Sequence, residues 1–173
     1  MFGTPVGNES NQQTWNYDEF TELYLDKEKM QAIWEVILHD PFFWTELDPL
    51  NVSVMWVINK IANRIFITDR PGITPKIQSI EFLGRWGVTD PRVYVARDKV
   101  PVAQEQHLIA HIDDRYSNCV ALRTALPDAY IALLWTPYNM VHHAEWRAQG
   151  GKIVLSVEQF IAECDRQDLV EWI

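Results

Sequence analysis

The sequence predicts an α/β fold, an open and mostly parallel sheet with helices on both faces. From Arg64 onward, short apolar runs alternate with segments of helical spacing, which is typical of this class. The chain has 173 residues, of which 47% are hydrophobic and 23% charged, with only 7 Gly and 9 Pro. This composition is that of one compact domain with a sizeable core.

The apolar runs predict strands, and the segments between them predict helices from the spacing of their apolar residues. The predicted strands are residues 64–68, 92–96, 108–112, 129–135 and 152–155. The predicted helices are residues 74–86, 102–107, 116–126 and 157–164. Residues 63–173 are therefore expected to form the α/β core. His142 and His143, beside Glu145, are predicted in a solvated loop rather than a metal site, because adjacent side chains diverge.

Residues 1–62 are predicted to form a separate helical region, a small cap with its connecting helix. Asp26 is suited to cap a helix that runs to Leu38, Asp40-Pro41 would end it, and a second helix follows Pro49. Aromatic residues recur densely over residues 15–44. Two interpretations are open for them, a cap core or a stacking surface for a nucleobase, and the cap core is favoured.

Charge and cysteine content exclude several classes of protein. The net charge of −9 disfavours general nucleic-acid binding, and it is concentrated in residues 1–50, whose balance is −8. No run of about 18 apolar residues and no secretory leader is present, so we predict a cytoplasmic protein without a membrane partner. Cys119 and Cys164 are too few for a disulfide scaffold or zinc cluster and are predicted to be reduced thiols.

Polar side chains follow the predicted strands at their carboxyl ends, where such sheets bind ligands. They are Thr68-Asp69-Arg70, Arg97-Asp98-Lys99, Asp113-Asp114-Arg115 and Thr136-Pro137-Tyr138-Asn139. A hydroxyl and a lysine are suitable partners for a phosphate, and paired carboxylates suit Mg²⁺. Each feature also has a plain structural explanation: a strand-end hydroxyl for Thr68, a solvated side chain for Lys99, and an ordinary turn for Asp113-Asp114. His111 is expected to be a hydrogen-bonded structural histidine.

In order and spacing these motifs resemble the haloacid dehalogenase-like (HAD) phosphohydrolases, in their 5′-nucleotidase and deoxyribonucleotidase-like branch. The resemblance rests on residues 66–72 as the second motif, Lys99 as the third and residues 112–115 as the fourth. It implies a Rossmann-like sheet, Mg²⁺ as cofactor and a nucleotide or other small phosphomonoester as substrate. By resemblance, Thr68 and Lys99 are the catalytic residues, Asp69 and Arg70 join them in substrate binding, and Asp113 and Asp114 are the metal ligands.

The chain departs from the family at its first motif. Family members carry an aspartate nucleophile in a DxD motif after a central first strand, and no aspartate before Thr68 lies in such a setting. We therefore expect that the central first strand is missing, that Met1 is an internal start, and that a partner or an oligomer fills the slot. An in-frame strand ending in DxD upstream of Met1 would support this hypothesis, and a stop codon directly upstream would refute it.

Two functions follow from this sequence. The first is a magnesium-dependent phosphatase of (deoxy)nucleoside monophosphates, truncated or inactive because the nucleophile is absent. The second is a non-catalytic nucleotide-binding or protein-interaction module on the same scaffold. Saturable nucleotide binding without hydrolysis would distinguish the second from an active enzyme.

Overall fold

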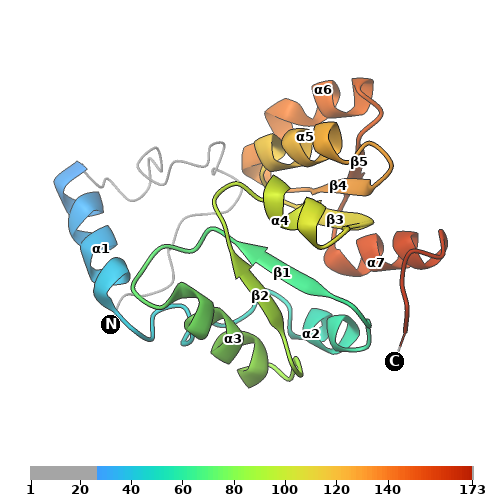
Figure 1. Ribbon diagram of the computed structural model, residues 1–173. Helices are drawn as coiled ribbons and strands as arrows, with labels where there is room; N and C mark the ends of the chain where they lie inside the picture. Colours follow the sequence, from blue (N-terminus) through green and yellow to red (C-terminus); the bar gives the residue numbers. More distant parts are fainter. Residues whose placement is uncertain (1–26, 173) are drawn as a thin grey trace.

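The computed structural model describes residues 27–172, and Figure 1 gives the arrangement of the elements. The described strands are β1 (Ile65–Thr68), β2 (Arg92–Val95), β3 (Ala110–Asp113), β4 (Tyr130–Leu134) and β5 (Lys152–Val154). The described helices are α1 (Lys27–His39), α2 (Val52–Asn59), α3 (Pro75–Arg85), α4 (Val100–Glu105), α5 (Tyr116–Ala125), α6 (His143–Ala148) and α7 (Val157–Asp165), with a 3₁₀ helix, η3 (Pro137–His142). The predicted α/β class is thus confirmed.

The strands of the described chain form two small parallel sheets. One has the order β1-β2, with Thr68 opposite Val95, and the other has the order β3-β4-β5, with Asp113 opposite Leu133. The prediction of parallel strands is confirmed, but β1 and β3 are not hydrogen-bonded to each other, so the predicted single open sheet is divided in two. Each of these two strands therefore has one edge without a paired strand.

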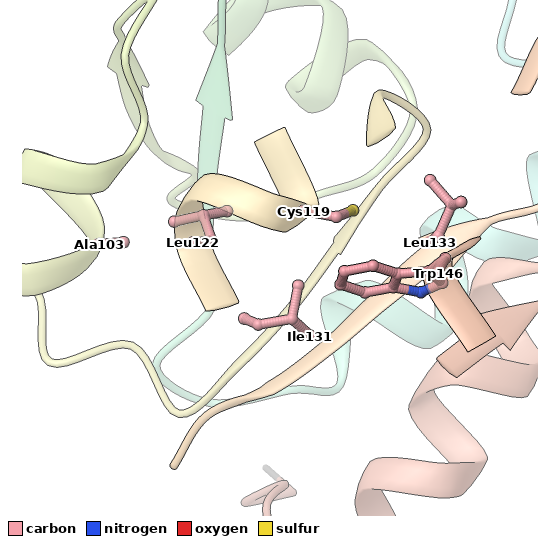
Figure 2. Close-up of a cluster of buried hydrophobic side chains, with 6 residues drawn as sticks. All are labelled: Ala103, Cys119, Leu122, Ile131, Leu133 and Trp146. Atoms are coloured by element: carbon pink, nitrogen blue, oxygen red, sulfur yellow. The ribbon is translucent and has the colours of Figure 1, made fainter. Parts of the chain in front are cut away.

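Each sheet has its own hydrophobic core. Beside the β3-β4-β5 sheet, Leu122 and Cys119 of α5 pack with Leu133 of β4 and the fully buried Trp146 of α6 (Figure 2). Figure 1 shows α5 and α6 on one side of this sheet and α7 on the other. The β1-β2 sheet has a smaller core of residues from α3 and β2, together with Val88. Burial of these apolar side chains is the main stabilising term for both halves.

Contacts at one end join the two halves. Ile61 and Trp172 form an antiparallel bridge, and the amide of Ala62 donates to the carbonyl of Glu171 at 2.7 Å. The Asn51 amide group and the Ser53 hydroxyl both donate to the Glu158 carboxylate. These bonds hold the segment before β1 against the last helix and the residues that follow it.

The region before α2 is less buried than a cap core would be. The predicted helix to Leu38 is present as α1, whereas Asp26 and the aromatic residues before it lie outside the described residues. Within the described part, Phe42 is 58% exposed and Trp34 36% exposed, so the cap-core prediction is wrong for these two rings. Trp44 is half-buried, and its indole donates to the Pro71 carbonyl at 2.8 Å.

Two predictions near the sheet edge are corrected by the structure. Strand β3 begins at Ala110 rather than residue 108, because His107 has a positive φ of 50° and Leu108 bonds back to the Ala103 carbonyl, which ends α4. The solvated loop predicted around His142 and His143 is wrong. These residues lie in η3 and α6, where the His142 ring stacks on Tyr116 and His143 bonds to Asn139.

Two other predictions concern the cysteines and the membrane. Cys119 and Cys164 are unpaired, as predicted, and both are buried; burial raises the pKa of the Cys164 thiol to about 12. Among residues 27–172, the helices are too short or too polar for any of them to span a bilayer.

The glycines at positions 151 and 84 provide a matched test of packing. A Cβ at Gly151 would lie 2.2 Å from two carbons of the Trp146 indole, whereas one at Gly84, an exposed position of α3, would meet nothing within 4 Å. We expect Gly151→Ala to lower the free energy of unfolding by about 1–3 kcal/mol through overpacking. Gly84→Ala should raise it by about 0.5 kcal/mol, because alanine is the better helix former. Urea unfolding followed by circular dichroism measures both, and equal stability of the two variants would contradict this packing.

Candidate functional site

A buried ion pair connects the ends of β2 and β3. Lys99 follows β2 by four residues and directly precedes α4, and Asp113 is the last residue of β3. The Lys99 ammonium lies 2.5 Å from Asp113 Oδ2, and the side chains are only 13% and 2% exposed. Because β1 is parallel to β2, this contact brings the carboxyl ends of β1, β2 and β3 to the same edge of the molecule.

Protein donors surround the Asp113 carboxylate. Oδ1 accepts from the backbone amide of Arg115 at 2.8 Å, and Oδ2 lies 3.3 Å from His111 Nε2. The Asn118 amide group contacts both oxygens, at 3.2 and 3.1 Å. Burial alone would raise the pKa of Asp113, but the His111 hydrogen bond and the charge and hydrogen bond of Lys99 outweigh it and hold the pKa well below its usual range. Asp113 is therefore an anion with its hydrogen-bonding capacity largely used.

Asp114 has a different environment from its neighbour. Its carboxylate accepts a hydrogen bond from the Tyr138 hydroxyl, and its carbonyl accepts from the Asn139 amide group at 2.8 Å. Burial raises the pKa of Asp114, the Tyr138 hydrogen bond opposes that rise, and the charge of Asp113 adds to it. The pKa values of these two adjacent carboxyl groups are thus shifted in opposite directions.

Asn139 holds the loop after β4 beside this pair. Its amide group donates to the carbonyls of Asp114 and Leu134, both at 2.8 Å, while its Oδ1 accepts from the Thr136 amide and lies 2.7 Å from His143 Nε2. The side chain is buried and its polar atoms are all bonded. Such a network fixes the position of Tyr138 and hence of the Asp114 carboxylate.

Thr68, Arg70 and Lys99 line one groove of about 850 Å³ that runs between β1 and β3. The structure thus brings together three of the predicted substrate-binding residues. Asp69 is exposed and does not line the groove, so its side chain is not part of this cluster. Asp113 joins the cluster through Lys99, and Asp114 lies next to it in the chain.

Arg70 is a half-buried cation held mainly by aromatic rings. Its guanidinium carbon lies 5.3 Å from the Trp44 ring centroid and 5.1 Å from that of Phe82, and Nη1 donates to the Ser79 hydroxyl at 3.3 Å. Within residues 27–172, no carboxylate forms an ion pair with it. Burial lowers its pKa from the usual value. A positive charge in this setting favours the approach of an anion.

The donor chemistry fits Mg²⁺ in part. Among the described residues no three His, Cys, Asp or Glu side chains form a group that could hold a metal ion by themselves. Mg²⁺ usually needs only one or two carboxylates and keeps several waters, so the consecutive Asp113 and Asp114 supply suitable hard oxygens. The cation would compete with Lys99 for Asp113 Oδ2, because that oxygen already accepts from the ammonium group.

Several residues of the site were not singled out by the sequence analysis. Asn118 was given no role, and Tyr138 and Asn139 were noted only as part of the strand-end segment 136–139. For the last two the signal was available, since the loop after β4 lies beside the loop after β3 in a parallel sheet. His111 is hydrogen-bonded, as expected, but its partner is the Asp113 carboxylate, two residues along the chain.

Comparison with protein-family models, with curated proteins and with solved structures finds no match to this chain. The function is therefore inferred from the geometry of the site and the resemblance of its motifs.

The Asp113 carboxylate provides a test of this electrostatic arrangement. We expect Asp113→Asn to lower the free energy of unfolding by about 3 kcal/mol near pH 7, because it leaves the Lys99 charge buried without a partner. The folded-state pKa is below the unfolded value, so this contribution is complete above about pH 4 and declines as the pH falls toward the folded-state pKa. Denaturant unfolding near pH 7 and near pH 3 should therefore show a smaller difference at the lower pH.

The exposed Asp128 provides the matched control for that substitution. Asp128→Asn should change the free energy of unfolding by less than about 0.5 kcal/mol at both pH values. A similar cost for the two variants would show that the Asp113 ion pair does not stabilise the fold.

Proposed function

We propose that this chain is an inactive relative of the HAD phosphohydrolases that binds a (deoxy)nucleoside monophosphate together with Mg²⁺. The observation that carries the proposal is the Lys99–Asp113 ion pair at the edge where Thr68 and Arg70 also lie. A hydroxyl, an ammonium and a guanidinium at one edge form a donor set suited to a phosphomonoester dianion.

Each residue has a separate role in this proposal. The Thr68 hydroxyl donates to a phosphate oxygen, and the Lys99 ammonium, which has three donors, contacts the phosphate while keeping its bond to Asp113. Arg70 adds positive charge from the side of Trp44 and Phe82. Asp113 and Asp114 would hold Mg²⁺, which offsets the negative charge of the phosphate.

The absence of turnover follows from the state of the carboxylates at this edge. Hydrolysis by this class of enzyme needs a free carboxylate to attack phosphorus. Of the described candidates, Asp113 is engaged by Lys99, His111 and Asn118, Asp114 accepts from Tyr138, and Asp69 lies outside the groove. The described residues thus support binding of the phosphate better than its transfer, which favours the non-catalytic alternative over an active phosphatase.

Isothermal titration calorimetry with each deoxynucleoside monophosphate, with and without Mg²⁺, tests the binding. We expect saturable binding that Mg²⁺ strengthens. Lys99→Met should weaken binding about tenfold or more, because it removes a charged donor. Thr68→Val should weaken it several-fold, because it replaces the hydroxyl with a methyl group of similar volume.

The exposed Lys152 supplies a charge-matched control for the lysine substitution. Lys152→Met should leave nucleotide affinity unchanged. Equal losses for the two lysine variants, or an affinity that Thr68→Val and Lys99→Met both leave intact in folded protein, would contradict the proposed site.

Phosphate release from the same nucleotides with Mg²⁺ tests the proposed inactivity. The full chain should release no phosphate above the uncatalysed background, because the described residues place no free carboxylate beside Thr68 and Lys99. Turnover that Asp113→Ala abolishes would show that the chain is a complete phosphatase and that its nucleophile was overlooked.

A further inference from the structure

The geometry points to a binding site for an extended peptide segment of another polypeptide, which inserts between β1 and β3 and joins the two sheets into one. The inference does not depend on nucleotide binding. It rests on the groove between β1 and β3. The candidate site lies where these strands have their carboxyl ends, and the inference concerns the part of the groove that runs along the two strands.

Two strand edges line the same groove. All four residues of β1, and Ala110 to Ile112 of β3, contribute to its wall. Strand β1 pairs only with β2, and β3 pairs only with β4, so within the described chain the other edge of each has no paired strand. The Lys99–Asp113 contact at one end, and the contacts of residues 61–62 with residues 171–172 at the other, hold these edges across from each other. An inserted strand would find backbone partners on both sides.

The incomplete burial of β1 and β3 also indicates that a neighbouring strand is missing between them. The residues of β4, which is paired on both sides, include three fully buried ones in succession, Ile131 to Leu133. Every residue of β1 and the first three of β3 are only half-buried, although Phe66, Ile67 and Ile112 are as apolar as those of β4. Strands with helices on both faces are normally buried throughout. These two strands lack the neighbour that would complete their burial.

The residues that line the groove indicate what kind of peptide segment it can bind. Phe82 and Leu83 of α3 line the groove, as do Phe160 and Ile161 of α7, so an inserted strand meets apolar helices as well as strand edges. A segment buried on both faces needs consecutive apolar residues rather than an alternating pattern. Since β1 and β3 each have four residues, a run of about four is the length they can pair.

The charged residues of the groove indicate which residues should flank the apolar run of the peptide. Among the described residues that line the groove, four are cations and two are carboxylates, in a chain whose net charge is −9. The cations are Arg64, Arg70, Arg92 and Lys99, and the carboxylates are Asp168 and Glu171. Because Lys99 is paired with Asp113, three arginines that form no ion pair within the described chain remain against the two carboxylates. A local excess of positive charge favours acidic residues beside the apolar run. We therefore assign the site to an extended, apolar peptide segment with acidic flanks, supplied by a partner protein.

A labelled peptide in which Val-Ile-Val-Ile is flanked on each side by two glutamates serves as the probe. Fluorescence anisotropy with the full chain should show saturable binding. A peptide with proline in the second position of the run should bind about tenfold more weakly, because proline removes a backbone donor, and so should one with lysine flanks. Equal binding of all three peptides would indicate nonspecific apolar contact and overturn the proposal.

Hydrogen exchange then locates the peptide. Binding of the acidic peptide should slow amide exchange in residues 65–68 and 110–113 together and leave residues 152–154 unchanged. Protection of only one strand, or of neither, would refute insertion between them. Slow exchange of both strands before the peptide is added would mean that another part of the chain or a second copy already fills the groove, which would also refute the assignment.

Two valine substitutions with the same change in charge test the groove itself. Val157 lines the groove at the first position of α7, where a glutamate is compatible with the helix, whereas Val141 is 73% exposed and lies outside it. Val157→Glu should weaken binding of the acidic peptide about tenfold through repulsion and lost apolar contact. Val141→Glu should leave it unchanged, and equal effects of the two variants would contradict a site in this groove.

Discussion

The ion pair between Lys99 and Asp113 is the constraint on which the geometry of the molecule depends most. It links the segment after β2 to the end of β3, and these two strands belong to different sheets with separate cores. A buried ion pair stabilises a protein only when further hydrogen bonds compensate for lost hydration. Asp113 has such bonds from His111, Arg115 and Asn118, so the pair fixes the relative position of the two halves at the candidate site.

Much of the framework could be predicted from sequence because it depends on local patterns. Alternating apolar strands and amphipathic helices predict parallel pairing, and polar residues after strands predicted the edge at which Lys99 pairs with Asp113 and at which Thr68 lines the groove beside Lys99. The division into two sheets, by contrast, could not be predicted from local patterns. A missing strand was expected from the resemblance, but whether β1 and β3 would close over the gap depends on packing of α3 and α7, which no local pattern records.

The errors of the sequence analysis also have physical reasons. Helix α6 has only six residues, too few for a periodic pattern, and it is held in place by Trp146, which packs into the core and donates to the Lys152 carbonyl. The setting of Arg70 depends on Trp44 and Phe82, which are distant in sequence. Phe42 shows the converse, because it is an aromatic residue in an apolar segment and yet remains 58% exposed. Tertiary contacts decide such cases.

Unpaired strand edges are also a hazard, because they can template the growth of aggregates between identical molecules. Here the two edges that line the groove, those of β1 and β3, are four residues long and face each other rather than open solvent. Arginines at both ends of that groove, and the overall negative charge, make stacking of one molecule on another unfavourable. The fold can therefore keep an incomplete sheet while resisting conversion into fibrils.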